Sequence, residues 1–332
     1  MLFRSDKVYK LMNYKPILIV HGEPNSILLE IFFKSLKYKK FKNPLILICS
    51  HKILKFQMKK LRFKMDIKII NPLLLDEIRL DNKTINIIDI EYNQNISFQK
   101  ISSKSSDYIK DCFKMSLQIL NSGLTNKLIN GPISKSSFLN KKFLGITEYL
   151  TKKTKASQSV MLIYNKRLSV CPITTHLPLK FVAKSLYKKK IIKKITIIDS
   201  FYKKNLRFKP KIAVLGLNPH CETVDKFNED ERIIKPAIKY LSRKKINVKG
   251  PFSADTAFLR ENRKNFDVIV GMYHDQVLTP VKTIFEYDAI NITLGLPFIR
   301  VSPDHGPNQK MLGQNKSNPL SLVRAIEFLE KN

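Results

Sequence analysis

The sequence predicts an α/β fold, and two observations lead to this prediction. Short runs of β-branched and aliphatic residues, of strand length, alternate along the chain with segments in which apolar residues recur at helical spacing. The composition, with 43% hydrophobic and 26% charged residues, is that of a soluble globular protein. With 332 residues, the chain is long enough for two ordinary domains or one large domain.

In the first part of the chain, predicted strands alternate with predicted helices. One helix is expected at 26–38, and a second at 102–122, with Ser102 or Ser103 as its N-cap. The strands are expected at 16–21, 44–50, 67–71, 84–90 and 127–131. This order of strand, helix and strand is typical of α/β layers.

The second part of the chain begins with two strands, 160–165 and 168–174, joined by a tight polar turn. A helix over 188–205 leads to a buried strand within 211–220, and a further apolar run at 268–270 ends at Gly271. The tail is predicted to form an amphipathic helix over 319–331, with the inward positions Leu320, Val323, Ile326 and Phe328.

The net charge of +33 invites comparison with nucleic-acid-binding proteins. The excess is mostly lysine, however, and it is scattered along almost the whole chain. Lysine, isoleucine and asparagine are abundant together, which is the bias that an AT-rich genome imposes through its codons. We therefore expect no specific nucleic-acid partner, although such a charge favours non-specific association with polyanions and acidic partners.

The apolar runs and the cysteines both indicate a cytoplasmic protein without a membrane partner. No apolar run approaches the ~20 residues that span a bilayer, and no apolar core of signal-peptide length precedes Lys15. Cys49, Cys112, Cys171 and Cys221 are far apart and form no CxxC pair, as expected of free thiols in a reducing compartment.

Three of the six histidines follow β-rich apolar segments in the same way. They are His176, His220 and His274. Because equivalent strand ends meet at one edge of a sheet, these imidazoles could bind a divalent metal such as Zn, Co or Fe. The alternative, unrelated loop histidines, remains open on spacing alone. His21 and His51 are interpreted as structural or exposed.

Polar residues near these histidines indicate an anionic substrate. Lys282, Asn291 and Arg300 follow His274 within one stretch, and cations of this kind bind phosphate or carboxylate groups. Lys135, at a strand-to-helix turn, is either a further anion-binding residue or a plain exposed lysine.

Two acidic residues are candidates for proton transfer. Asp255 and Asp275 could each accept a proton or support a histidine ligand. Helix capping is an equally good explanation for Asp255, because Ser-Ala-Asp-Thr also reads as a helix start.

The ten glycines are never closer than seven positions apart, so the sequence has no GxGxxG motif. The Rossmann dinucleotide fingerprint is therefore absent. The residues by themselves indicate a metal site with an anion pocket and do not indicate a nicotinamide cofactor.

Several segments resemble the 4-hydroxythreonine-4-phosphate dehydrogenase family of pyridoxal 5′-phosphate biosynthesis. They are TTHLPL (174–179), GLNPH (216–220), SADT (253–256), MYHDQ (272–276), NITLGLPFIR (291–300) and DHG (304–306), with GEP at 22–24 at the first-strand turn. Their order and spacing also fit, and the resemblance covers nearly the whole chain.

The resemblance implies two α/β domains around a cleft, like those of isocitrate and isopropylmalate dehydrogenases. The first domain would comprise 1–130 with 305–332 and carry the cofactor side. The second, 131–304, would carry the metal, substrate and dimer interface. A homodimer is implied, with a metal site that draws ligands from both subunits.

The resemblance also implies roles for individual residues. The metal, Zn, Mg or Co, would be held by His176, His220 and His274. The substrate, 4-phosphohydroxy-L-threonine, would be held by Thr147, Lys282, Asn291 and Arg300. The cofactor, NAD or NADP, would be bound near Asp304, His305 and Gly306. The implied reaction forms a β-keto acid that decarboxylates to 3-amino-2-oxopropyl phosphate.

The chain departs from the family pattern in three places. Ile146 stands where the family has a histidine before Thr147, the 221–230 loop lacks its usual glycines, and 307–309 replace a different run beside the cofactor loop. Ile146 keeps open a related activity on phosphoerythronate or phosphothreonate. A catalytically weakened or silent protein is a third interpretation, against which the retained histidines and cations argue.

Overall fold

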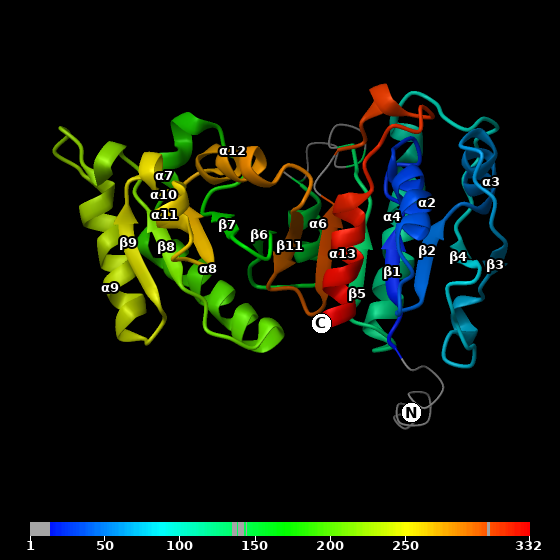
Figure 1. Ribbon diagram of the computed structural model, residues 1–332, viewed down its shortest axis with the longest axis horizontal. Coiled ribbons are helices and arrows are strands. Elements are labelled where there is room, and N and C mark those ends of the chain that lie inside the picture. Colours follow the sequence, from blue (N-terminus) through cyan, green and yellow to red (C-terminus); the bar gives the residue numbers. More distant parts are fainter. Residues whose placement is uncertain (1–13, 135–137, 139–142, 144, 304–305) are drawn as a thin grey trace. The chain divides into compact units, whose positions relative to one another are not determined.

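The computed structural model describes residues 14–134, 138, 143, 145–303 and 306–332. The chain separates into two compact units (Figure 1). The first contains the described residues up to Thr154 together with Pro297–Lys331, and the second contains Lys155–Leu296. Each unit combines a sheet with helices, so the predicted α/β class is confirmed.

The sheet of the first unit has the strand order β3-β4-β2-β1-β5-β12, and all its neighbouring strands are parallel. β1, β2 and β5 are buried along their whole length, as expected of a parallel sheet covered on both faces. The strands are β1 (Ile17–Val20), β2 (Leu45–Cys49), β3 (Ile67–Ile69), β4 (Ile85–Asp89), β5 (Lys127–Asn130) and β12 (Ile299–Pro303).

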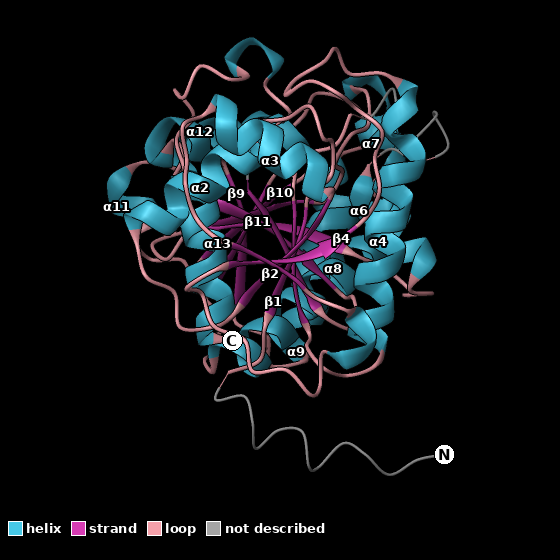
Figure 2. Ribbon diagram, turned by 90° about the vertical axis from the view of Figure 1, so that its right-hand side faces the viewer, coloured by secondary structure: helices cyan, strands magenta, loops and turns pink. Residues whose placement is uncertain are grey.

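Helices cover both faces of this first sheet. α2 and α13 lie on one face and α4 lies on the other (Figure 2). Ser50 directly follows β2 and caps α3, because its hydroxyl oxygen accepts the Ile53 N–H. The helices are α2 (Leu28–Tyr38), α3 (His51–Lys60), α4 (Ser106–Asn121), α6 (Ile146–Lys153) and α13 (Leu320–Lys331).

The sheet of the second unit has the order β11-β6-β7-β10-β8-β9. β6 is antiparallel to both of its neighbours, whereas β7, β10, β8 and β9 run parallel. The strands are β6 (Val160–Tyr164), β7 (Ser169–Pro172), β8 (Ile212–Leu215), β9 (Val248–Phe252), β10 (Val268–Gly271) and β11 (Ile290–Leu294).

In the second unit α12 packs against β7 and β10, and α8 packs against β6 and β11. One core cluster joins Val277 and Val281 of α12 to Val170 of β7 and Ile269 of β10. The helices are α7 (Val182–Ser185), α8 (Lys188–Phe201), α9 (Lys235–Arg243), α10 (Ala254–Ala257), α11 (Arg260–Arg263) and α12 (His274–Phe285).

Strands β1 to β8 lie within the predicted ranges and β10 follows the predicted apolar run, whereas β9, β11 and β12 were not predicted as strands. The start of α4 was predicted wrongly. The helix begins at Ser106, after a 3-10 turn over Ser103–Ser105, and Ser102 makes no side-chain cap bond. The Ser105 hydroxyl instead donates to Glu23 Oε2 at 2.9 Å. In α13, Val323, Ile326 and Phe328 are buried as predicted, while Leu320 is half-buried.

The boundaries of the two units differ from those expected for the two domains. Residues 297–303 lie in the first unit because β12 pairs with β5. Helix α6 also lies there, and its Tyr149 packs against Phe113 of α4 with tilted rings whose centroids are 5.9 Å apart. Arg300 and Thr147, two of the predicted substrate-binding residues, therefore share one unit.

The cysteines agree with the sequence prediction. All four are free thiols, and Cys49, Cys112 and Cys171 are buried while Cys221 is partly exposed. Of the helices in the described ranges, none is long and apolar enough to span a membrane.

Candidate active site

Arg300 is the charged centre of the first unit. It is the second residue of β12 and only 1% exposed. The parallel register pairs Arg300 with Leu128, and side chains alternate between the two faces of a strand. Asn130, two residues beyond Leu128, therefore lies on the same face as Arg300.

Two hydrogen bonds hold the Arg300 guanidinium. Its Nε donates to Asn130 Oδ1 at 2.6 Å, and Nη1 donates to Thr147 Oγ1 at 3.4 Å. Burial lowers the pKa of Arg300 to about 10, while the negative charge of Glu148 acts in the opposite direction. The guanidinium is therefore protonated at neutral pH and suits an anionic ligand.

Thr147 and Ile146 occupy the first turn of α6, where both are half-buried. The preceding residue, Gly145, stands at the N-cap of this helix. Ile146 presents a hydrocarbon side chain where the resemblance predicts an imidazole. Thr147 of α6 thus supplies a hydroxyl, whereas Ile146 supplies no ring nitrogen.

The predicted cofactor loop is described only at its end. Asp304 and His305 lie outside the described residues, as does Lys135. Gly306 is exposed, and a Cβ added there would meet nothing within 4 Å. The next residue, Pro307, accepts the Ile27 N–H at 3.2 Å, which places this segment beside the turn after β1.

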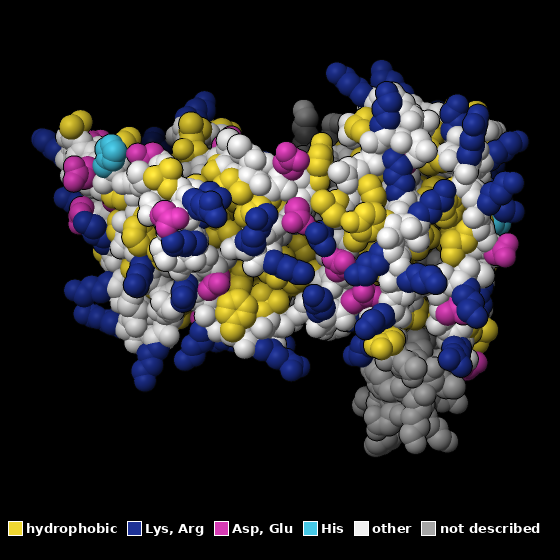
Figure 3. All heavy atoms as spheres, viewed as in Figure 1, with side chains coloured by type: hydrophobic (Ala, Val, Ile, Leu, Met, Phe, Trp, Pro, Cys, Tyr) yellow, Lys and Arg dark blue, Asp and Glu magenta, His cyan; other side chains and the backbone are white. Residues whose placement is uncertain are grey.

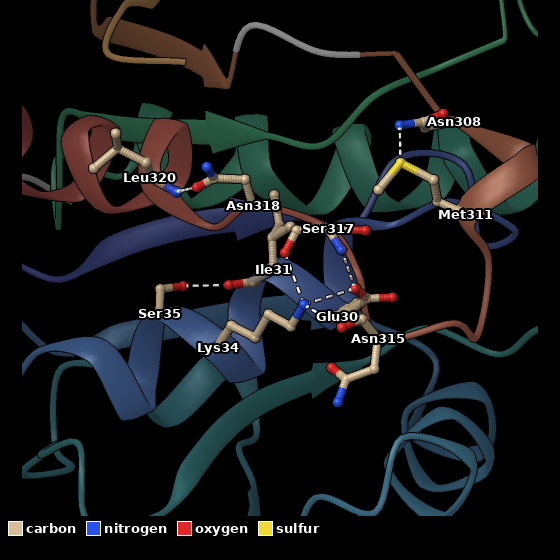
Figure 4. A network of polar contacts seen from close by, with 10 residues as sticks. All are labelled: Glu30, Ile31, Lys34, Ser35, Asn308, Met311, Asn315, Ser317, Asn318 and Leu320. Atoms are coloured by element: carbon tan, nitrogen blue, oxygen red, sulfur yellow. Dashed lines mark hydrogen bonds and ion pairs between the residues drawn. The ribbon is translucent and has the colours of Figure 1, made fainter. Parts of the chain in front are cut away.

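A polar network fastens the rest of that segment to α2 (Figure 4). Lys34 Nζ donates to the carbonyls of Asn315 and Ser317 at 2.9 and 2.7 Å. Glu30, 2% exposed, accepts the Ser317 N–H at 2.6 Å and the Lys34 ammonium at 3.0 Å. The chain that follows the predicted cofactor loop is thus anchored to a buried carboxylate.

The turn after β1 is a second buried polar region of the first unit. Gly22 has φ +73°, and an added Cβ would lie 2.5 Å from the Pro132 carbonyl oxygen, so only glycine fits. Glu23 is fully buried, and burial raises its pKa. β1 lies between β2 and β5. The chain continues from β1 toward β2, on one side, and later adds β5 on the other side. Ligands of open α/β sheets bind at such points, where the strand order reverses.

In the second unit, β7, β10 and β8 are parallel neighbours, so their carboxyl ends share one edge. His176, His274 and His220 follow these strands, in that order. The rings of His176 and His274 are 6.0 Å apart between centroids. Given a metal–nitrogen bond of about 2.0–2.1 Å, two imidazoles at this separation can share one ion.

Asp275 supports His274 directly. His274 begins α12, and its Nδ1 lies 2.7 Å from Asp275 Oδ1. A carboxylate that accepts a hydrogen bond from Nδ1–H leaves the lone pair of Nε2 available to a metal and fixes the ring. Asp255, by contrast, is exposed in the first turn of the short helix α10.

His220 is exposed in a short turn (Pro219–Cys221), with a left-handed backbone at φ 53°. Beside it is a cavity of about 580 Å³, whose lining includes Cys221, Ser253 and Thr256. Within the described ranges, no three His, Cys, Asp or Glu side chains lie close enough together to hold a metal ion. The strand ends thus converge as predicted, whereas within one chain the three histidine side chains do not form a metal-binding group.

Asn291 and Lys282 are the remaining predicted substrate residues. Lys282 is half-buried on α12, and Asn291 lies on β11 opposite Ile163. Asn291 Oδ1 is buried and has no hydrogen-bond partner among the described residues. An unsatisfied buried oxygen costs about 1–3 kcal/mol, and a ligand hydroxyl or amine would satisfy it.

On the face shown in Figure 3, the positive charge of the described residues is not gathered in one stripe. Lysine and arginine are spread over the face shown in Figure 3, with hydrophobic, acidic and uncharged side chains between them. This distribution agrees with the scattered lysines of the sequence.

Comparison with known proteins identifies the family. Residues 40–329 match the model of the pyridoxal phosphate biosynthetic protein PdxA family. The chain belongs to this family. A relative from Sulfurihydrogenibium sp. (strain YO3AOP1), named 4-hydroxythreonine-4-phosphate dehydrogenase, is 38% identical over 315 residues, covering 93% of this chain and 96% of its own. The prediction that the chain is a dehydrogenase of this kind is confirmed.

Relatives with a different substrate name are also similar. The D-threonate 4-phosphate dehydrogenase of Salmonella typhimurium is 31% identical over 324 residues, covering 96% of this chain and 98% of its own. Relatives of this chain are therefore named for two activities, on 4-hydroxythreonine 4-phosphate and on D-threonate 4-phosphate.

Solved structures agree in fold. The 4-hydroxythreonine-4-phosphate dehydrogenase of Klebsiella pneumoniae has a TM-score of 0.83 at 29% identity, covering 96% of this chain and 98% of its own. A β-decarboxylating dehydrogenase from Thermococcus kodakarensis has a TM-score of 0.52 at 10% identity, covering 95% and 82%. The predicted likeness to isocitrate-type dehydrogenases is confirmed at the level of the fold.

Sequence reasoning missed Asn130 and Glu23 as parts of this region. No motif marks either residue as a ligand. The signal for Asn130 is its position two residues beyond Leu128, the register partner of Arg300, and this appears only when β5 and β12 are paired. Glu23 stands in the predicted GEP turn, but its contact with Ser105, in the turn before α4, appears only in the folded chain.

Proposed function

We propose that the protein catalyses the metal-dependent, NAD(P)-linked oxidation of 4-phosphohydroxy-L-threonine in pyridoxal 5′-phosphate biosynthesis. The product is a β-keto acid that decarboxylates to 3-amino-2-oxopropyl phosphate. The observation that carries the proposal is the buried, protonated Arg300 within hydrogen-bond distance of Thr147. A cation desolvated in this way favours an anionic ligand such as a phosphorylated hydroxy acid.

Four residues bind the substrate in this proposal. Arg300 and Lys282 neutralise its phosphate and carboxylate charges. Thr147 offers a hydroxyl beside Arg300, and Asn291 offers a buried oxygen to a substrate hydroxyl or amine. Thr147 and Arg300 belong to the first unit, whereas Lys282 and Asn291 belong to the second.

A divalent metal, Zn, Mg or Co, is proposed to be held by His176, His220 and His274. The paired rings of His176 and His274 and the Asp275 carboxylate on His274 support this set. The proposed active protein is a homodimer whose metal site draws ligands from both subunits. When bound, the ion lowers the pKa of the substrate hydroxyl that is oxidised.

NAD or NADP is proposed to bind beside Asp304, His305 and Gly306. The open space around Gly306 and the anchored segment that follows fit a ligand lying against this backbone. When bound, the nicotinamide supplies the hydride acceptor. The Glu30–Lys34 network holds the segment that follows, at Asn315 and Ser317.

Proton transfer is assigned to the acidic residues. Asp255 is exposed and available as a proton acceptor, and it is the proposed base for the substrate hydroxyl. Asp275 keeps His274 Nδ1 engaged and acts through that ring. We propose a cytoplasmic location, consistent with four free thiols.

One observation favours a second substrate. Ile146 occupies the position where an imidazole would reach the substrate, and relatives named for D-threonate 4-phosphate match almost the whole chain. A phosphorylated sugar acid, phosphothreonate or phosphoerythronate, is therefore the alternative.

An NADH-absorbance assay tests these proposals. Purified protein with added divalent metal should reduce NAD or NADP with 4-phosphohydroxythreonine, and chelation should stop the reaction until metal is restored. Turnover only with phosphothreonate or phosphoerythronate would establish the second substrate. No turnover with any of the three, in metal-loaded dimer, would contradict both.

A further inference from the structure

The side chain of Asn130 is oriented by two opposite hydrogen bonds. Asn130 ends β5 and is 2% exposed. Its Nδ2 donates to the Gly131 carbonyl at 2.8 Å. The amide oxygen therefore points away from that carbonyl and accepts the Arg300 Nε–H at 2.6 Å.

We propose that Asn130 is a positioning residue, which orients the Arg300 guanidinium toward an anionic group of the substrate. The inference rests on the proposed function, in which Arg300 binds a phosphate or carboxylate. A guanidinium carries five N–H donors in one rigid plane. Once Nε is engaged by Asn130 and the plane is set, the edge formed by the two Nη atoms is the one directed at the ligand.

The surroundings of Arg300 explain why such orientation matters. The strand register places Asn130 diagonally next to Arg300 on one face, so the contact needs no loop to close. On the other side, Nη1 reaches Thr147, and Glu148 adds a negative charge nearby. A guanidinium fixed before the ligand arrives loses less conformational freedom on binding than one that must first be ordered.

A purely structural role for Asn130 is the competing explanation. Its bond to Gly131 lies where the turn after β5 meets the turn after β1, and a Cβ on Gly131 would lie 2.2 Å from the His21 carbonyl oxygen. Removing Asn130 could thus disturb the turn alone. The test needs a readout that follows the guanidinium itself.

Nitrogen-15 NMR of arginine Nε–H groups provides that readout. The Arg300 Nε–H signal is assigned by its loss in Arg300→Lys. In the wild type it should be shifted and protected from solvent exchange, because it is buried and bonded to Asn130. Asn130→Ala should abolish that protection, and Asn130→Asp, which keeps an oxygen at the same place, should restore it.

Kinetics supply the second measurement. Asn130→Ala should raise KM for the phosphorylated substrate about tenfold, the effect expected for a lost bond to a charged group, with kcat changed less than about threefold. Asn86→Ala is the matched control. Asn86 is equally buried in the same sheet and donates to the Leu45 and Asp81 carbonyls, away from Arg300. It should lower thermal stability and leave KM unchanged.

Two outcomes overturn the proposal. An unchanged Nε–H signal and KM in Asn130→Ala would do so, as would KM changes of equal size in Asn130→Ala and Asn86→Ala. If the wild type turns over no substrate, the proposed function fails on its own. Asn130 is then judged by the Nε–H signal and by calorimetric binding of 4-phosphohydroxythreonine and phosphothreonate, which should weaken about tenfold in Asn130→Ala. Equal binding by wild type and variant would refute it.

Discussion

Histidines follow strands in both units of this protein, but they have opposite environments. His21 comes directly after β1, is fully buried, and bonds to Tyr108 through Nδ1 at 2.9 Å. Burial lowers its pKa to about 3, so it stays neutral in the folded protein at ordinary pH. His176 and His220, also beyond strand ends, are exposed. The same place in the fold therefore holds a buried packing histidine in one unit and, in the other, exposed histidines that we propose as metal ligands.

The charged groups differ between the units in the same way. In the first unit Arg300 is buried and already held by Asn130 and Thr147. In the second, His274 and Asp275 lie at the surface, with side chains 34% and 81% exposed. The first unit presents a preorganised cation, whereas the second presents ligands that an ion would organise. The following predictions test this contrast.

The largest effect is expected from Arg300→Lys. Lysine keeps the charge but loses the planar fork, and it leaves Asn130 Oδ1 without its donor. We expect kcat/KM to fall by about 100-fold or more, since disrupting a buried charge contact costs roughly 2–5 kcal/mol. Arg324→Lys, at a surface ion pair with Glu327, is the control. A decrease below threefold would mean that Arg300 is not a preorganised anion site.

Metal binding should depend on the exposed histidines. His220→Ala is expected to lose the bound metal, measured by elemental analysis of the purified dimer after dialysis, because a three-ligand site is left with two protein ligands. His51→Ala, at a half-buried histidine on α3, is the control. Unchanged metal content in His220→Ala would remove that residue from the ligand set.

Asp275→Asn should have a smaller effect on the same site. The amide can no longer accept the Nδ1–H of His274 as a charged partner, so metal affinity should fall about 10–100-fold. Competitive titration against a chromophoric chelator measures this. Asp288→Asn is a control in the same unit, outside the proposed site. Equal affinities for Asp275→Asn and wild type would show that the carboxylate does not support the ring.

The burial of His21 should make the free energy of unfolding depend on pH. Below pH 6.5 the unfolded chain protonates His21, whereas the folded protein resists protonation down to about pH 3. The contribution of His21 to the free energy of unfolding is therefore fully present above pH 6.5. It decreases as the pH falls below 6.5, by up to about 1.4 kcal/mol per pH unit. Urea unfolding at several pH values should show a shallower dependence in His21→Gln than in wild type or His51→Gln. Parallel curves would contradict the burial of a neutral imidazole.

The smallest effect is expected from restoring an imidazole at Ile146. Ile146→His adds a donor beside Thr147 and should lower KM for 4-phosphohydroxythreonine a few-fold, in keeping with one neutral hydrogen bond of about 1 kcal/mol. Ile69→His, at an exposed position on β3, is the control. A lower KM only for phosphothreonate would instead point to the sugar acid as substrate.

Much of the fold was predictable because burial patterns are local. The apolar runs at 44–50 and 127–131 predicted β2 and β5, and the spacing at 319–331 predicted α13. The start of α4 was not predictable, because Ser105 is bound by Glu23, a residue 82 positions away. The family motifs predicted Arg300 and Thr147 as substrate residues. They did not predict that both lie in the first unit, because this depends on the pairing of β12 with β5.

The sequence by itself determined the α/β class, the family and the histidines that follow strands β7, β8 and β10, because these are properties of short segments. Tertiary structure alone decided which polar groups lose their water. It buried His21 and Arg300, left His176 and His220 exposed, and brought Asn130 to the Arg300 guanidinium. The physical reason is that desolvation and strand register depend on neighbours distant in the chain, and no local pattern of residues records them.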